Sequence, residues 1–284
     1  MRTKRVNRLK RTNKKNKKVY PYVLLFLFGI LIFSYPFISQ YYYDIESNKI
    51  IVNFSEEANK IKREELDRKL ELAKAYNSTL NPLKLADPYT DNEEKGIAEY
   101  ARMLEVKEMI GHVEIPKLSL DIPIYAGTSD EVLEKGSGHL EGSSLPIGGE
   151  SSHTVLTAHR GLSSAVMFRN IDKLKEGDVF LIHNIFGTLA YKVDKIQVVK
   201  PTNFDPVLVV EGKDYATLLT CDPYLINSHR LLVRGYRIPY SENSINYEDS
   251  SFKNIYLMLI VIFILSVFLM LFRRKLKNGK NKQQ

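Results

Sequence analysis

The sequence of 284 residues contains a single cysteine, Cys221, and this scarcity limits how the chain can be stabilised and what it can bind. A lone cysteine cannot form an intramolecular disulfide, so the fold must be stabilised by its hydrophobic core. The chain also has no closely spaced cysteine pair and no His-x-x-x-His pattern, which are common ligand arrangements of zinc sites. We therefore expect no metal and no other cofactor.

Acidic residues are absent from both ends of the chain, although the whole sequence contains 33 of them. Ten Lys or Arg residues occupy positions 1–18 and six more occupy positions 273–284, so the rest of the chain has a formal charge of −8 although the total is +8. Basic tails beside apolar segments are attracted to anionic lipid, and they leave no basic stripe for phosphates. This pattern favours membrane lipid as a partner and argues against nucleic acid.

Two apolar runs adjoin the basic ends, over Tyr20–Ser39 and Ile255–Phe272. Each is close to the ~20 residues that an α-helix needs to cross a bilayer. A cleaved signal peptide is the alternative for the first run, but residues 39–43 offer no small-x-small cleavage site. Because basic flanks stay in the cytoplasm, we expect a two-pass cell-membrane protein with both termini cytoplasmic and residues 40–254 outside.

The segment that follows the first apolar run has helical character. Apolar residues recur at mostly helical spacing from Phe54 to Leu80, and Ser55–Glu57 is typical of a helix start. A second short helix is predicted over residues 93–104. Between the two helices, the triplet at Asp87–Tyr89 has the composition of an ordinary turn.

From Gly111 onward the sequence is rich in short apolar or alternating runs separated by Gly and Pro. Such runs predict a mainly β fold that closes into a barrel. The segment Gly136–Gly138 is interpreted as one of the turns. The predicted strands are His112–Ile115, Ile122–Tyr125, His153–Ala158, Val179–His183, Ala190–Val199, Tyr215–Thr220 and Arg230–Tyr236.

Cys221 lies between a predicted buried strand and the Asp222-Pro223 turn, and Arg230 begins the next predicted strand. A cation on the neighbouring strand favours the thiolate, which is the nucleophilic form of cysteine. The alternative is a buried cysteine that acts as a small apolar side chain. These residues taken alone leave both interpretations open.

Among the six histidines, His159 is the best candidate for catalysis. It ends a predicted strand and precedes Arg160-Gly161, so it lies in a loop at a strand edge, where catalytic groups are common. The other five have neither a second ligand nor a nucleophile at a telling spacing, and we interpret them as structural. They are His112, His139, His153, His183 and His229.

Two motifs weigh on the role of Cys221. Thr217–Cys221 reads Thr-Leu-Leu-Thr-Cys with Arg230 nine positions on, and Thr157–Gly161 reads Thr-Ala-His-Arg-Gly. Together they resemble the sortases, membrane-bound cysteine transpeptidases of Gram-positive bacteria, over roughly residues 80–240. The resemblance implies an eight-stranded β-barrel with short helices. It also implies that Cys221 is the nucleophile, His159 the general acid/base and Arg230 the group that stabilises substrate and oxyanion.

The segment ahead of the predicted barrel is similar to that of class C sortases, the pilus-building branch. These enzymes carry a lid with an Asp-Pro-aromatic motif, which Asp87, Pro88 and Tyr89 match, with Tyr where many members have Trp or Phe. The resemblance implies that the substrates are pilin or other surface proteins with a Leu-Pro-x-Thr-Gly-like sorting signal, joined through a lysine amine. Two alternatives remain: a housekeeping sortase that attaches proteins to a cell-wall precursor, and a non-enzymatic membrane-anchored binding domain.

These expectations divide the chain into eight segments. They are a basic cytoplasmic tail (1–19), a transmembrane helix (20–39), an extracellular helical segment (40–80), a lid loop (81–92), the sortase catalytic β-barrel (93–240), a linker (241–254), a second transmembrane helix (255–272) and a basic cytoplasmic tail (273–284).

Overall fold

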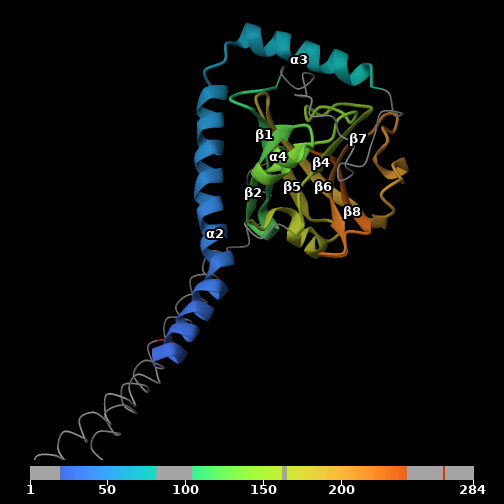
Figure 1. Cartoon of the computed structure of the whole chain (residues 1–284). Coiled ribbons are helices and arrows are strands. Elements are labelled where there is room, and N and C mark those ends of the chain that lie inside the picture. Colours follow the sequence, from blue (N-terminus) through green and yellow to red (C-terminus); the bar gives the residue numbers. More distant parts are fainter. Residues whose placement is uncertain (1–19, 81–103, 162–164, 242–264, 266–284) are drawn as a thin grey trace, which may run out of the picture.

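The structure, a computed structural model, describes residues 20–80, 104–161, 165–241 and 265 (Figure 1). Several sequence predictions lie wholly or almost wholly outside these residues and stay predictions. They are the lid at Asp87–Tyr89, the short helix over 93–104, the linker over 241–254 and the second apolar span over 255–272.

Eight strands form a closed barrel, in the order β1, β2, β3, β4, β7, β8, β6 and β5, with β5 returning to pair with β1. This confirms the predicted eight-stranded barrel with short helices. The strands are β1 (Met109–Ile115), β2 (Leu120–Ala126), β3 (Ser137–His139), β4 (Ser152–Thr157), β5 (Val179–Asn184), β6 (Gly187–Val199), β7 (Asp214–Asp222) and β8 (His229–Ile238). The helices are α2 (Tyr20–Ala58), α3 (Arg63–Ser78), α4 (Asp130–Lys135), η3 (Pro116–Leu118), η4 (Met167–Lys173) and η5 (Asp205–Val207).

The sequence prediction missed strand β3. This three-residue strand lies within the Gly-rich segment that we interpreted as a turn, and it pairs with β2 in parallel and with β4 in antiparallel orientation. Gly138 fits there because a Cβ at that position would lie 2.3 Å from the carbonyl oxygen of Gly127. Close backbone approach therefore selects glycine inside a strand, and a composition of small residues hides the strand from a pattern search.

The predicted helix start at Ser55–Glu57 is wrong. These residues form the last turn of α2, which runs without interruption from Tyr20 through the first apolar run to Ala58. The actual break falls at residues 59–62, after which α3 begins at Arg63. The apolar and charged halves of α2 share one helical backbone, so the change in composition marks a change of surroundings and not a helix boundary.

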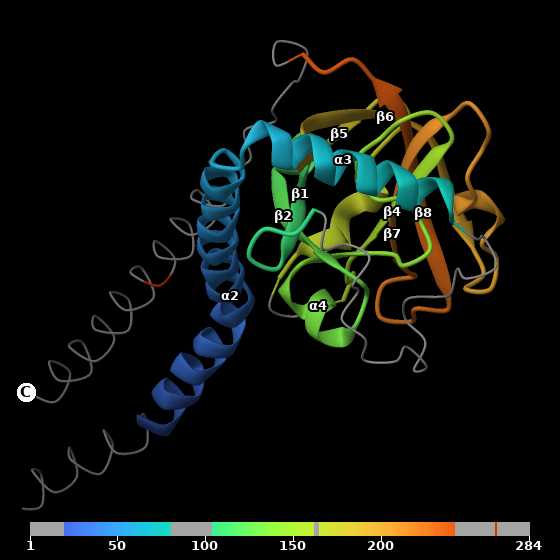
Figure 2. The ribbon, with the colours of Figure 1, turned by 90° about the horizontal axis from the view of Figure 1, so that it is seen from above.

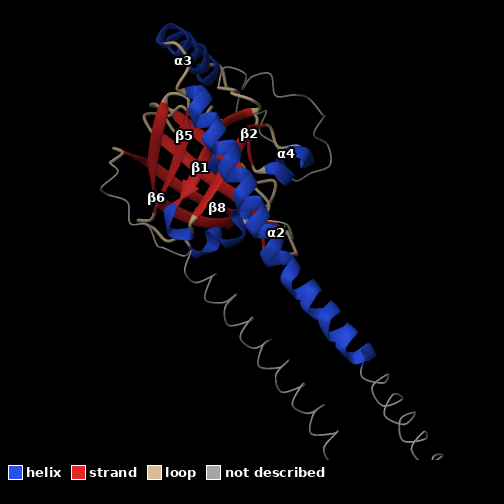
Figure 3. Ribbon diagram, turned by 90° about the vertical axis from the view of Figure 1, so that its left-hand side faces the viewer, coloured by secondary structure: helices blue, strands red, loops and turns tan. Residues whose placement is uncertain are grey.

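Helix α2 lies along one side of the barrel, against β1 and β2, and α3 crosses one end of it (Figures 1, 2 and 3). Ile51 and Phe54 anchor the C-terminal half of α2 in the core and are 7% and 3% exposed. Nearer its middle, the Ser47 hydroxyl donates to the carbonyl of Asp121, and the side-chain oxygen of Gln40 accepts from the backbone N–H of Val166 at 2.5 Å. Among the helices within the described residues, none has both the length and the hydropathy required of a membrane span.

The core is packed closely enough to dictate residue size. Phe180 of β5 pairs with Tyr191 of β6, and their buried rings are stacked with centroids 5.7 Å apart. Gly235 of β8 lies against both side chains, because a Cβ there would approach Phe180 Cε1 to 2.9 Å and Tyr191 Cβ to 3.0 Å. Burying each large apolar side chain contributes about 1.5–3 kcal/mol. A barrel without disulfides among its described residues is therefore held by this packing and by the closed hydrogen-bonded ladder.

Candidate active site

Cys221 and Arg230 lie directly opposite each other on the antiparallel strands β7 and β8. Residues paired in this way project their side chains from the same face of the sheet, with Cβ atoms about 4.5–5.5 Å apart. Both residues are buried, at 6% exposure each. The sequence placed these residues on adjacent strands, and the register makes them partners.

His159 reaches the same region through a parallel strand pair. Strand β4 runs parallel to β7 with Thr157 opposite Leu219, so continuing that register by two residues brings His159 level with Cys221. Two hydrogen bonds extend the pairing beyond the strand end: Ala158 N–H donates to the carbonyl of Leu219 at 3.3 Å, and the Thr220 hydroxyl donates to the carbonyl of Ala158 at 2.7 Å. The three predicted site residues are thus brought together from β4, β7 and β8.

Burial lowers the pKa of His159 from its ordinary value of 6.5. Desolvation disfavours the charged imidazolium, while Asp130 and Glu134 of α4 oppose this effect by raising the pKa. The backbone of His159 is held from the other side by η4, where the N–H of Phe168 donates to the His159 carbonyl at 3.2 Å. The His159 ring is half-buried, which lowers its pKa, and two nearby acids partly offset that decrease.

Arg230 also holds the loop that connects β7 to β8. Its Nη1 donates to the carbonyls of Asn227 and His229, each at 2.9 Å. Asn227 and Leu225 both have positive φ, at 59° and 68°, so this loop contains backbone that needs support from its surroundings. These bonds stabilise the β7–β8 loop, and they also hold the Arg230 guanidinium in place.

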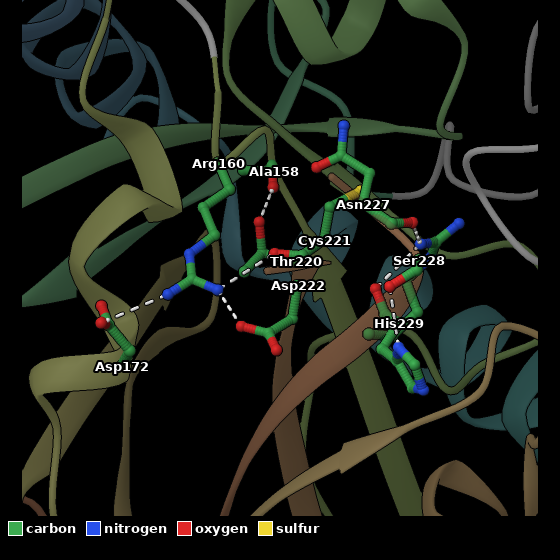
Figure 4. Close-up of polar contacts among 10 residues, drawn as sticks. Ala158, Arg160, Asp172, Thr220, Cys221, Asp222, Asn227, Ser228 and His229 are labelled. Carbon is green, nitrogen blue, oxygen red and sulfur yellow. Dashed lines mark hydrogen bonds and ion pairs between the residues drawn. The ribbon is translucent and has the colours of Figure 1, made fainter. Parts of the chain in front are cut away.

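A third charged side chain was missed in the sequence. Arg160, beside His159, lies between Asp172 of η4 and Asp222 of β7, and its side chain is 8% exposed (Figure 4). In the sequence, Arg160 is only part of the histidine motif and Asp222 only part of a predicted turn. The sequence did contain a signal: Arg160 directly follows His159, and the oppositely charged Asp222 directly follows Cys221.

The remaining histidines make local contacts that support the structural interpretation. His139 is fully buried, with Nε2 2.8 Å from the Ser144 carbonyl oxygen, and burial lowers its pKa to about 4. His112 and His183 stack with ring centroids 4.3 Å apart, and each lies within hydrogen-bonding distance of a carboxylate, Asp121 and Glu114 respectively. The contacts of the other two are with Thr217 for His153 and with Ser228 for His229.

Across the part of the chain that the structure describes, no group of three or more His, Cys, Asp or Glu residues is arranged to hold a metal ion. The strand register brings a thiol, an imidazole and a guanidinium to this site. A thiol beside an imidazole is the arrangement of a cysteine nucleophile with an acid–base partner.

Comparison with known proteins agrees with this site. The sortase domain family matches residues 113–238, which include all three predicted catalytic residues. The crystal structure of sortase C-1 from Streptococcus pneumoniae is 54% identical, with a TM-score of 0.66, and the match covers 68% of this chain and 100% of that one. The chain belongs to the sortase family, the cysteine transpeptidases, so the non-enzymatic alternative is wrong.

The neighbouring structures also identify the branch. The pilus-related sortase C of Group B Streptococcus is 58% identical, with a TM-score of 0.64, over 66% of this chain and 96% of that one. Sortase D of Bacillus subtilis (strain 168) is 31% identical over 137 residues, which is 47% of this chain and 66% of that protein. The predicted class C membership is confirmed by the sortase C structures, one of which is named as pilus-related.

Proposed function

We propose that this enzyme joins pilin subunits covalently, with Cys221 as the nucleophile, His159 as the general acid/base and Arg230 as the cation that stabilises the oxyanion. The observation that carries the proposal is the strand register, in which Cys221 faces Arg230 across β7 and β8 and His159 is level with Cys221 at the end of β4. The pilin substrate is supported by the sortase C neighbours, one of which is named as pilus-related.

The reaction proceeds in two balanced steps. The Cys221 thiolate attacks the carbonyl carbon of a peptide bond in a Leu-Pro-x-Thr-Gly-like sorting signal, and Arg230 stabilises the oxyanion that forms. The C–N bond then breaks, the departing amine takes a proton from the His159 imidazolium, and a thioester remains on Cys221. In the second step a lysine amine of another pilin attacks the thioester and returns a proton to His159. The C–S bond breaks, and an amide bond between subunits is the product.

We also propose that the catalytic barrel is held at the outer face of the cell membrane by spans at residues 20–39 and 255–272. The support is the charge pattern, since basic residues flank each apolar run. The exposed face of α2 fits this placement, because Leu25, Phe28 and Leu31 are each at least 60% exposed. Protease added to intact protoplasts should digest residues 40–254 and spare tags on both termini. Digestion of a C-terminal tag would rule out the two-span topology.

The activity is tested by incubating the purified full-length protein with candidate pilins and following covalent ladders on a denaturing gel. Ladders that appear with the native protein and vanish with Cys221→Ala support the proposal. Mass spectrometry of the Cys221→Ala protein should find no acyl adduct, and an adduct there would assign the nucleophile elsewhere. Cleavage of the signal without ladders, and with transfer to a cell-wall precursor, would instead support the housekeeping role.

A further inference from the structure

The guanidinium of Arg160 joins three segments of the barrel at the active site (Figure 4). Its Nη2 lies 3.2 Å from Asp172 Oδ2 on η4, while Nη1 donates to Asp222 Oδ1 and, at 3.4 Å, to the carbonyl oxygen of Cys221. Arg160 itself belongs to the turn that carries His159. One side chain therefore connects the His159 turn, the end of the Cys221 strand and η4.

A buried cation is retained in a fold only where acceptors offset the loss of hydration, and Arg160 has two carboxylates and a carbonyl. The two carboxylates lie on different segments, and each contacts a different nitrogen of the guanidinium. A planar fork with donors on two nitrogens suits this arrangement, whereas a lysine ammonium is a single point charge. The contact geometry thus requires arginine and not merely a positive charge.

We infer that Arg160 is a positioning residue that fixes the His159 turn against the end of the Cys221 strand. This inference rests on the proposed roles of Cys221 and His159. The residue before His159 is tied to β7 by the bonds between Ala158, Leu219 and Thr220, and the residue after it is tied to the same strand through Arg160. His159 is therefore held at both of its backbone neighbours.

The same contact has an electrostatic consequence for the thiol. Asp222 directly follows Cys221, and an uncompensated carboxylate on the adjacent residue disfavours a thiolate. Pairing with Arg160 neutralises the charge of Asp222. Loss of Arg160 should therefore both loosen the His159 turn and leave a negative charge beside the nucleophile.

The test compares Arg160→Lys and Asp172→Ala with Arg234→Lys in the full-length protein. Arg234 is the matched control because it binds Asp194 through two nitrogens, at 3.0 and 2.7 Å, farther along β8. Since a misplacement of 1 Å costs on the order of 100-fold, we expect kcat for a sorting-signal peptide to fall about tenfold or more in Arg160→Lys. Asp172→Ala keeps the contact between Arg160 and Asp222, so its kcat should fall less. KM should change little in either variant.

Two measurements separate positioning from a general loss of stability. A looser His159 becomes more hydrated, so the alkaline limb of its pH–rate profile should move to higher pH in both variants, whereas partial unfolding lowers the rate at every pH. Alkylation of Cys221 by iodoacetamide, measured without substrate at neutral pH, should slow at least about threefold in Arg160→Met, because an unpaired Asp222 disfavours the thiolate. Arg234→Lys should leave all three readouts unchanged.

The outcomes distinguish this inference from the proposed function. If the native protein cleaves the peptide, the folded Arg160→Lys and Asp172→Ala variants keep its kcat and pH limb, and Arg160→Met keeps its alkylation rate, the positioning role is wrong. If the native protein forms no thioester while Arg160→Met still slows alkylation, the proposed function fails and the contact with the Cys221 strand stands.

Discussion

Replacing Arg230 with lysine tests whether the geometry of the cation matters as well as its charge. In the native protein Nη1 bonds two backbone carbonyls, those of Asn227 and His229, while the residue lies opposite Cys221. An ammonium on a flexible stem cannot make both bonds and keep the same place, so we expect at least one charge-assisted bond to be lost. Such a bond contributes about 1.5–3 kcal/mol. Expressed in the transition state, the loss lowers kcat/KM by about 10- to 150-fold, since roughly 1.4 kcal/mol is a factor of ten.

The assay is cleavage of a fluorogenic sorting-signal peptide, with thermal unfolding measured on the same preparations. Arg234→Lys is the control, because it makes the same substitution four residues along the same strand, at a partly buried ion pair with Asp194. Limited proteolysis of the β7–β8 loop should rise only in Arg230→Lys, since that loop loses a carbonyl partner at Asn227. Activity within twofold of the native value, in a folded Arg230→Lys protein, would refute the argument from geometry.

Three further predictions concern pH and the lid. Asp130→Asn with Glu134→Gln removes two charges that raise the pKa of His159, so the alkaline limb of the pH–rate profile should move to lower pH; an unmoved limb would place these acids outside the site's electrostatics. Burial lowers the pKa of both His139 and His153 from 6.5 to about 4 in the folded protein. Below pH 6.5 the unfolded chain binds protons that the folded protein does not. The stability is therefore highest above pH 6.5 and falls as the pH drops toward 4. Urea titrations should show the unfolding free energy dropping by about 2 kcal/mol per histidine between pH 7.5 and 5, and a His139→Asn variant should lose its share of that slope. Asp87→Ala and Tyr89→Ala should each speed labelling of Cys221 by a small thiol reagent and raise peptide cleavage, by about tenfold at most, because surface contacts of this kind contribute only about 0.2–1.5 kcal/mol. Labelling at the native rate in both folded variants would leave the triplet as an ordinary turn.

The local pattern of the sequence identified most of the fold, and motifs that resemble those of sortases pointed to the three proposed catalytic residues. Alternating and apolar runs predicted seven of the strands within a few residues, because the periodicity of two reflects which side of a sheet is buried. The eighth, β3, has no such pattern, since Gly138 is selected by the approach of a neighbouring backbone. The start of α3 was misplaced for a related reason: Ser55–Glu57 has the composition of a helix start, but packing of Ile51 and Phe54 on the barrel continues α2 through it.

The sequence by itself singled out Cys221, His159 and Arg230 as candidates, because a single cysteine and two motifs that resemble those of sortases are local features. Only the tertiary structure decided how these groups meet. The pairing of β4 with β7 and of β7 with β8 places residues 159, 221 and 230 at one edge of the barrel, although their spacing along the chain differs widely. The tertiary structure also decided the partners of Arg160. Its buried guanidinium is stabilised by two carboxylates that lie 12 and 62 residues away along the chain. No local sequence pattern specifies contacts at those separations.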